Sequence, residues 1–220
     1  VSEFSIQTGS ILVIIAGLVL TIYLINKWYL TTVEKLLHVD LDLASWRQYI
    51  EMNKEGKRAV LRSGAATSEV ALAYMTGDFE TAIRKAEEIL NRDGLQPQFR
   101  NVLQIYRIRS VVLSQPELSR EELDAMIGEL TITDPTMAEK TQKISVALYD
   151  LTIANESNDY FETLTNEYKY PQLEIIYYKA LNAAIKGDKD RATELLRQLA
   201  GEDEKLYVVR MGKDVLNTGN

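Results

Sequence analysis

The first pattern along the chain is an uninterrupted run of apolar residues near its beginning. From Phe4 to Asn26 no residue is charged, and residues 11–25 read ILVIIAGLVLTIYLI, which is apolar on every helical face. As a helix this run is roughly 34 Å long, enough to cross a hydrocarbon layer of about 30 Å. We therefore predict a transmembrane helix over residues 10–30, after a short segment 1–9. A buried core helix and a cleaved signal peptide are the alternatives, but no basic residue precedes the run and no A-x-A-like site follows it.

The residues that follow the run have the chemistry of a membrane boundary. Lys27, Trp28 and Tyr29 are expected at the membrane interface, where aromatic rings and lysine are favoured. Lys27, Lys35 and Arg47 follow the span and no basic residue precedes it, so the positive-inside rule places the large C-terminal part in the cytoplasm. Lysines upstream of Val1 would reverse this orientation.

Apolar residues keep helical spacing almost throughout the chain after residue 43, which predicts an all-α fold. All four prolines stand where helices would start or break. The predicted helices cover residues 44–55, 58–76, 79–91, 98–114, 120–130, 136–154, 158–167, 172–186 and 189–200, with a short one near 204–211. Residues 37–43, LHVDLDL, instead alternate between apolar and polar positions. We therefore predict a linker over residues 31–43 that is extended over residues 37–43. A continuous helix out of the membrane is the alternative.

Three helix starts can be identified from their capping residues. Ser119 and Glu122 have the spacing of a capping box, in which each side chain accepts a free backbone amide of the other residue. Asp134 before Pro135 predicts an N-cap with proline at the first helical position. Asp188, after a glycine, is expected to cap a third helix.

Two segments align without gaps 110 positions apart. Residues 71–90 read ALAYMTGDFETAIRKAEEIL and residues 181–200 read LNAAIKGDKDRATELLRQLA. Both contain an alanine followed by G-D-x-x-x-A, which predicts a helical hairpin: glycine ends the first helix, aspartate caps the second, and small alanines allow close packing.

This pattern resembles the tetratricopeptide repeat, a helix-turn-helix unit of 34 residues that stacks into a superhelix. The resemblance implies a divergent TPR-like α-solenoid of antiparallel helix pairs over residues 44–206, followed by a C-terminal tail at 207–220. An irregular helical bundle is the alternative. In the family, the first helices of successive hairpins line a partner-binding groove. The resemblance implies that this groove is lined by Thr67, Ala71, Tyr74, Met75, Tyr177, Leu181, Ala184 and Ile185.

Tyrosines are concentrated late in the chain, and such amphipathic aromatics are favoured at interfaces. We add Tyr168, Tyr170 and Tyr178 to the candidate partner-binding residues, which are then Tyr74, Met75, Tyr168, Tyr170, Tyr177, Tyr178, Leu181 and Ile185. Ordinary core packing is the alternative for the whole set. The basic stripe Lys54, Arg58 and Arg62 has i, i+4, i+8 spacing and is read either as a lipid-headgroup contact or as a solvated face partly paired with glutamates.

Composition narrows the chemistry that the chain can perform. The absence of cysteine removes disulfides and thiolate chemistry, and one histidine, His38, leaves little imidazole chemistry. The net charge of −7 argues against nucleic-acid binding. No phosphate loop, dinucleotide fingerprint, zinc-protease motif or EF-hand loop is present.

These observations predict a single-pass, membrane-anchored scaffold or adaptor, bacterial in type, with no catalytic site, metal or other cofactor. The expected partners are the lipid bilayer and a protein or membrane complex, with no nucleic acid and no small-molecule substrate. The alternative is an extracytoplasmic chaperone-like accessory factor of a translocation or envelope-assembly machine, which requires the opposite topology. An enzyme or enzyme subunit is a third possibility.

Overall fold

The computed structural model describes residues 35–218, and the elements in this range are all helical. The chain divides into two units, residues 1–42 and residues 43–220, and each is described by itself. The segment 1–9, the predicted span 10–30 and the interfacial residues Lys27, Trp28 and Tyr29 lie outside the described residues. Within residues 35–218, no helix combines the length and the apolarity needed to cross a bilayer.

The described end of the first unit differs from the predicted extended linker. Residues Lys35–Val39 form a π-helical turn, η1, closed by a hydrogen bond of 2.8 Å from the Asp40 amide to the Lys35 carbonyl. The extended prediction for residues 37–39 was wrong because alternation stabilises a strand only beside a partner strand, and the described chain offers none. The helix does not continue into α2 either: Leu41 takes a positive φ of 53°.

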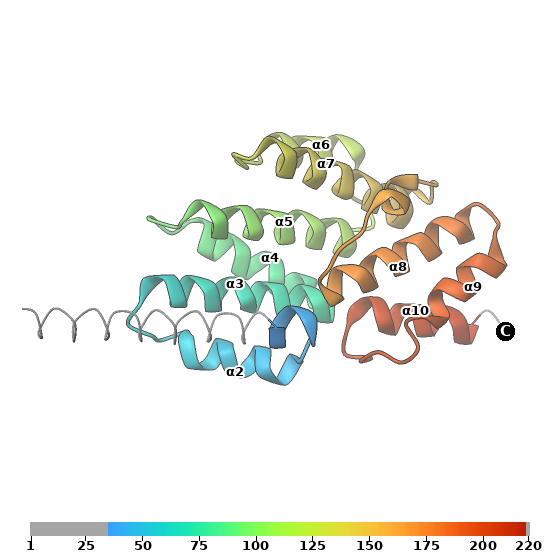
Figure 1. Cartoon of the computed structure of the whole chain (residues 1–220). Helices are drawn as coiled ribbons and strands as arrows, with labels where there is room; N and C mark the ends of the chain where they lie inside the picture. Colours follow the sequence, from blue (N-terminus) through green and yellow to red (C-terminus); the bar gives the residue numbers. More distant parts are fainter. Residues whose placement is uncertain (1–34, 219–220) are drawn as a thin grey trace, which may run out of the picture. The chain divides into compact units, whose positions relative to one another are not determined.

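The second unit contains nine α-helices and two shorter helical segments among its described residues (Figure 1). They are α2 (Leu43–Asn53), α3 (Ala59–Thr76), α4 (Phe79–Leu90), α5 (Pro97–Ser114), α6 (Arg120–Gly128), α7 (Pro135–Tyr149), the π-helical η2 (Asp150–Ala154), the 3-10 helix η3 (Asp159–Thr163), α8 (Lys169–Ile185), α9 (Lys189–Arg197) and α10 (Tyr207–Thr218). The all-α prediction is confirmed for these residues.

Helices that follow each other in the sequence pack against each other in most of the unit (Figure 1). α2 lies on α3, α3 pairs with α4, and α5 contacts both α3 and α4. α7 packs against α5, and α8 pairs with α9. The unit is therefore built mainly from contacts between neighbouring helices, as a solenoid or an irregular bundle would be.

The predicted caps are confirmed. The Ser119 hydroxyl accepts the Glu122 amide at 3.2 Å, and the Glu122 carboxylate accepts the Ser119 amide at 2.8 Å, so both halves of the capping box form. Asp134 caps α7 by accepting the Thr136 amide at 2.9 Å, with Pro135 in the first turn.

The two hairpins predicted from the internal repeat have the same turn geometry. Gly77 and Gly187 take φ of 83° and 84°, the left-handed region that glycine enters without a Cβ clash. In each turn the amide after the glycine bonds back to an alanine carbonyl, Ala73 or Ala183, at 2.9 Å. This 6→1 bond defines a Schellman motif and satisfies a carbonyl that the ending helix leaves free. Asp78 and Asp188 then cap α4 and α9 by accepting an amide three residues on, at 3.2 and 3.1 Å.

Three segments differ from the predicted helices in form or in extent. Residues 150–154 continue α7 in π form and end at Asn155, whose φ is 53°. The helix predicted over 158–167 is a 3-10 helix of five residues, because Asn158 caps its start and an extended Leu164 ends it. The tail predicted at 207–220 is wrong for residues 207–218, where α10 packs on α8 and α9 and buries Val208 and Val209 completely.

Candidate functional site

The candidate partner-binding residues predicted from the sequence lie mostly in the interior of the second unit. Five of them are at most 5% exposed: Tyr74, Met75, Tyr170, Tyr177 and Tyr178. The other three, Tyr168, Leu181 and Ile185, are partly exposed. The five buried residues are therefore core residues in this structure, as the alternative of ordinary core packing expects.

Aromatic contacts join the first helices of the second unit, α3 and α4, to its last helices, α8 and α10. The Tyr74 ring on α3 lies 5.1 Å from the Tyr106 ring and 6.2 Å from the Tyr170 ring on α8, measured between centroids. Phe79 and Tyr207 pack edge to face at 4.9 Å. Such pairs contribute about 0.5–1.5 kcal/mol each beyond their buried area.

A buried polar cluster lies beside these rings. The Tyr74 hydroxyl donates a hydrogen bond of 2.5 Å to Glu174 Oε1, and Glu174 is only 7% exposed. Glu174 Oε2 lies 3.8 Å from Arg109 Nη1. Burial raises the pKa of Glu174, while Arg109 and the Tyr74 hydrogen bond act in the opposite direction. Burial also raises the pKa of Tyr106 to about 12 and those of Tyr74 and Tyr178 well above the usual value, so these phenols stay neutral near pH 7.

Glu174 and Arg109 were not among the residues predicted from the sequence. The available signal was the position of Glu174, four residues after Tyr170 and three before Tyr177, which places a carboxylate on the buried aromatic stripe of α8. A charge on such a stripe is rarely buried without a partner. The sequence did not identify that partner, because Arg109 is 65 positions away.

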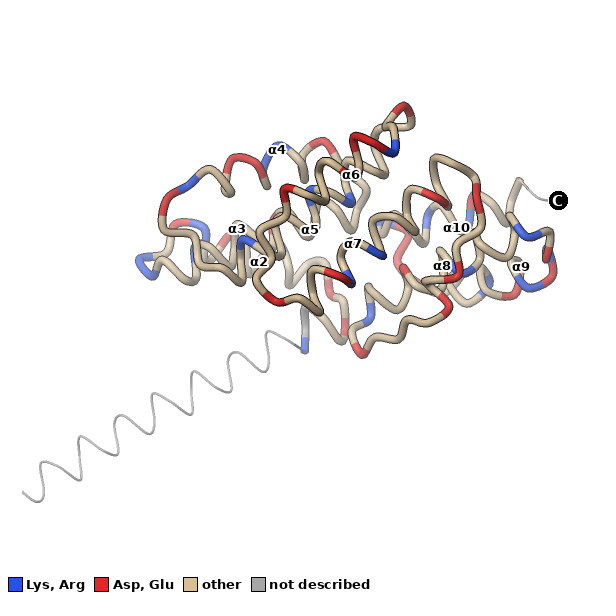
Figure 2. The backbone as a smooth tube through the Cα atoms, turned by 90° about the horizontal axis from the view of Figure 1, so that it is seen from above, with Lys and Arg blue, Asp and Glu red and all other residues tan. Residues whose placement is uncertain are grey.

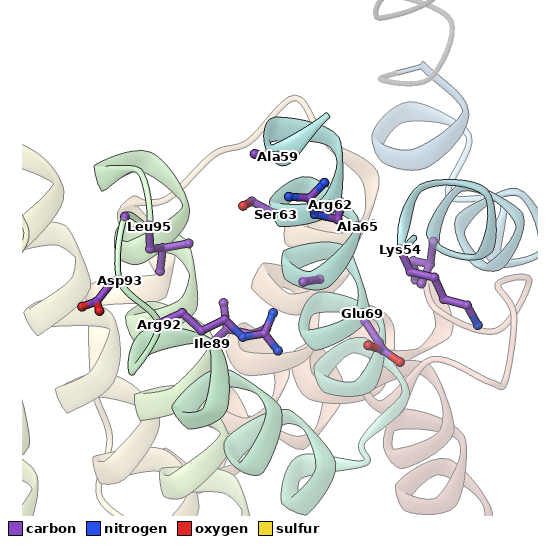
Figure 3. A pocket seen from close by; sticks show the side chains of 13 residues that line it. Lys54, Ala59, Arg62, Ser63, Ala65, Glu69, Ile89, Arg92, Asp93 and Leu95 are labelled. Atoms are coloured by element: carbon purple, nitrogen blue, oxygen red, sulfur yellow. The ribbon is translucent and has the colours of Figure 1, made fainter. Parts of the chain in front are cut away.

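A cleft of the second unit lies where α2, α3 and the end of α4 meet (Figure 3). Its volume is about 380 Å³. Small side chains of α3, including Ser63 and Ala66, lie along it, with Lys54 on one side and Arg92 and Asp93 on the other. The lining of this cleft therefore combines small side chains with charged side chains of both signs.

The charged groups around this cleft are mostly paired with near neighbours. Lys54 pairs with Glu51 at 2.5 Å, Arg92 with Glu88 at 2.5 Å, and Glu69 with Lys85 at 2.8 Å. Arg62 donates to the carbonyls of Gly56 and Lys57 at 2.7 and 2.9 Å and so holds the α2–α3 loop. The basic stripe is thus partly used within the fold, as the solvated-face alternative expects. Figure 2 shows acidic and basic residues interspersed over the helices of the unit.

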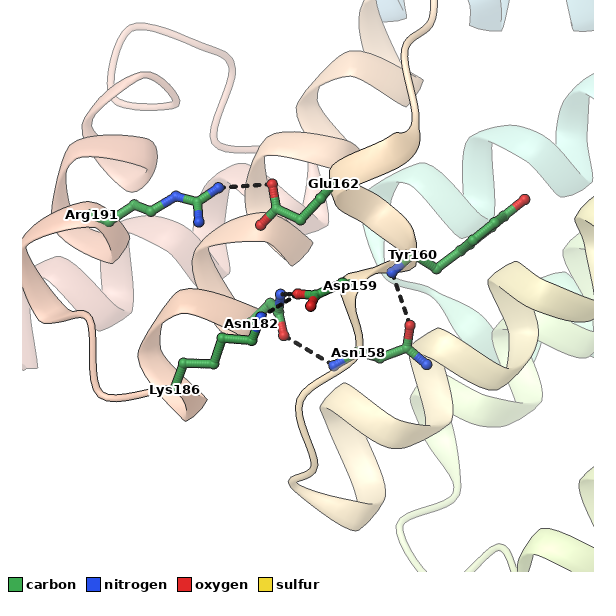
Figure 4. Close-up of polar contacts among 7 residues, drawn as sticks. All are labelled: Asn158, Asp159, Tyr160, Glu162, Asn182, Lys186 and Arg191. Atoms are coloured by element: carbon green, nitrogen blue, oxygen red, sulfur yellow. Dashed lines mark hydrogen bonds and ion pairs between the residues drawn. The ribbon is translucent and has the colours of Figure 1, made fainter.

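A second polar network fixes η3 against α8 and α9 (Figure 4). The Asn182 side chain accepts the Asn158 amide at 3.0 Å and donates to Asp159 at 2.7 Å. Lys186 also bonds Asp159, and these two hydrogen bonds, the Lys186 bond first, lower the pKa of Asp159. Arg191 bonds Glu162 at 2.7 Å. The network positions η3, which carries the buried Phe161.

Within residues 35–218, no cluster of His, Asp or Glu side chains has the grouping that a metal ion needs. The chain matches no known protein-family model, no curated protein and no solved structure. A functional interpretation therefore depends on the residues and surfaces described above.

Proposed function

We propose that this chain is a membrane-anchored, non-catalytic scaffold or adaptor that binds a partner protein on the outer surface of its helical unit, as part of a membrane complex. The uncharged run from Phe4 to Asn26 supports the membrane anchor. The position of the aromatic residues supports binding on the outer surface, because Tyr74, Tyr177 and Tyr178 are buried core residues.

The observation that carries the proposal is the α2–α3–α4 cleft. Its volume is about 380 Å³, and small side chains such as Ser63 and Ala66 would allow a partner backbone to approach closely. Lys54, Arg92 and Asp93 at its sides would select a partner segment that carries both charges. Such mixed charges favour specificity and orientation over affinity.

Site-specific photo-crosslinking in native membranes tests this surface. A photoreactive residue replacing Ser63 should form one discrete adduct, identified by mass spectrometry, whereas the same residue replacing the exposed Gln142 of α7 should not. Ala66→Phe, combined with the probe at Ser63, should abolish the adduct by filling the cleft. Equal adducts at both positions, or an adduct that survives Ala66→Phe, would refute binding in this cleft.

Orientation can be tested separately because the chain has no cysteine. A single cysteine replacing Gln142 should react with a membrane-impermeant maleimide only after the membrane is permeabilised, if the helical unit faces the cytoplasm. Labelling of intact cells would contradict this topology and favour the extracytoplasmic accessory factor.

A further inference from the structure

Two strongly exposed apolar side chains lie on either side of the loop between α2 and α3. Met52, in the last turn of α2, is 67% exposed, and Val60, in the first turn of α3, is 50% exposed. No other large apolar side chain that the structure describes is as exposed as these two. A single exposed apolar residue needs no explanation. Two of them at one end of a helical hairpin favour a contact surface.

The same loop is basic, although the chain as a whole is acidic. Residues 51–62 contain four basic and two acidic residues, whereas the whole chain has a net charge of −7. Figure 2 shows basic positions at the α2–α3 loop. Lys54 is paired with Glu51 at 2.5 Å. Lys57 and Arg58 are exposed and form no ion pair with another residue of the described range. These two cations are therefore free to meet an external anion.

Arg62 holds the loop in shape from within the fold. Its Nη1 donates to the carbonyls of Gly56 and Lys57 at 2.7 and 2.9 Å. The Gly56 amide in turn donates to the Asn53 carbonyl at 3.1 Å. These bonds tie the loop to the first turn of α3 and to the last residue of α2. Because the loop is already ordered, docking would cost little conformational entropy.

An anionic bilayer surface fits this loop better than a protein does. Basic residues are attracted to the headgroups of anionic lipids, and apolar side chains beside them enter the boundary between headgroups and acyl chains. A stable protein interface draws about 20–30 residues from each partner, far more than one loop supplies. Lipids need no complementary shape, so two cations and two apolar side chains suffice for a weak contact that adds to an anchor.

We propose that the α2–α3 loop docks on the surface of an anionic bilayer. Lys57 and Arg58 contact phospholipid phosphates, and the exposed ends of Met52 and Val60 enter the lipid beside them. The contact rests on the proposed membrane anchor, which supplies the effective concentration that a weak contact needs. In the sequence, residues 31–42 separate that anchor from α2, and α2 is about 16 Å long, so the loop can reach the surface of the same bilayer.

Fluorescence of the full chain in lipid nanodiscs tests the contact. The chain has no cysteine, so Val60→Cys can carry a single environment-sensitive fluorophore. In discs of equal parts phosphatidylcholine and phosphatidylglycerol, its emission should shift to the blue, and lipids with a shallow nitroxide should quench it. In discs of phosphatidylcholine alone, the probe should remain in water. The same fluorophore on Gln142→Cys, at an exposed position of α7, should remain in water in both discs. A Val60 probe that is unquenched in anionic discs, or quenched equally in both lipids, would overturn the proposal.

Two double variants locate the contact within the structure. Each basic residue near an anionic surface contributes about fivefold, so Lys57→Gln with Arg58→Gln should lower the ratio of docked to free loops about 25-fold. Fluorescence lifetimes of the Val60 probe give this ratio. Lys189→Gln with Arg197→Gln is the matched control, because these exposed residues of α9 carry the same charge, and it should leave the ratio unchanged. Equal losses in both double variants would show a general charge effect and refute docking by the loop.

Failure of the anchor and failure of the loop contact give different results. Retention of the chain in phosphatidylcholine discs requires the anchor, because the loop finds no anionic lipid there. A retained chain whose probe stays unquenched in anionic discs refutes the loop contact alone. A chain lost from phosphatidylcholine discs refutes the anchor; quenching by an excess of anionic vesicles then supports the loop contact, and its absence overturns it. A probe shielded in native membranes but not in anionic discs would assign the loop to a protein partner and overturn lipid docking.

Discussion

Replacing Tyr74 with phenylalanine tests the contact that joins the two ends of the helical unit. The substitution removes the hydroxyl that donates to Glu174 Oε1 at 2.5 Å and leaves the ring packing intact. Both residues are buried, at 1% and 7% exposure, so water cannot easily replace the lost donor. A hydrogen bond to a charged group contributes about 1.5–3 kcal/mol, and we expect this loss in the free energy of unfolding at a pH where Glu174 is ionised.

The cost of Tyr74→Phe should depend on pH. The Tyr74 hydrogen bond lowers the pKa of Glu174, so removing the bond raises this pKa further. Below the pKa values of both proteins, Glu174 is protonated and the loss should fall to about 0.5–1.5 kcal/mol, the range for a neutral hydrogen bond. As the pH rises through the pKa that Glu174 has in the wild type, the folded variant must ionise Glu174 without the hydrogen bond from Tyr74. The destabilisation should therefore increase with pH.

Urea denaturation of the full chain in detergent, followed by circular dichroism at several pH values, measures this effect. Tyr106→Phe is the matched control, because the two rings lie 5.1 Å apart but the Tyr106 hydroxyl makes no hydrogen bond with the described residues. A Tyr74→Phe loss no larger than that of Tyr106→Phe, or one that does not change with pH, would refute the argument.

Three further predictions use matched variants and the same unfolding assay. Burial raises the folded pKa of Glu174 above its ordinary 4.5, so the stability that its protonated form contributes is present below pH 4.5 and is lost as the pH rises through the folded pKa. Glu174→Gln should therefore gain stability relative to wild type over that pH range. A stability difference that does not change with pH would contradict this. Gly77→Ala should cost more than Gly187→Ala: both have positive φ, worth about 1–2 kcal/mol, but only at Gly77 would the added Cβ meet Tyr207, at 2.9 Å. Equal losses would place Tyr207 elsewhere. Ala82→Leu and Ala192→Leu should each lower the free energy of unfolding by about 1–3 kcal/mol, because both alanines are buried where hairpin helices meet. Ala125 is exposed, so the control Ala125→Leu should be nearly neutral. Neutral results at both buried alanines would argue against the aligned hairpins.

The local features of this fold could be predicted because short-range chemistry decides them. Asp78, Ser119 and Asp134 cap helices through amides within three residues, and Gly77 is required where φ is positive. No distant contact is needed to identify these positions. The conformation of the linker was harder to predict, because alternating apolar and polar residues at 37–43 indicate a strand only where a partner strand exists.

The position of the buried tyrosines could not be predicted in the same way. Tyr74 and Tyr177 have the spacing of a helix face, but a face can line an open groove or a closed core with the same periodicity. The decision depends on Tyr74 meeting Glu174, which is 100 positions away. The short helix predicted near 204–211 overlaps α10, but its full length and its packing were not predicted, since its partners α8 and α9 are identified only in three dimensions.

Contacts between the first hairpin and the last helix also favour the outer cleft over the predicted groove. Arg210 on α10 donates to the Thr76 carbonyl at 3.1 Å, and Tyr207 packs on Phe79. In an open solenoid each repeat contacts only its neighbours, and the concave surface is free for a ligand. Here a partner that entered between α3 and α8 would first have to break the Tyr74–Glu174 hydrogen bond and expose the aromatic core. Binding in the α2–α3–α4 cleft needs no such opening, because Ser63 and Ala66 are already partly accessible there.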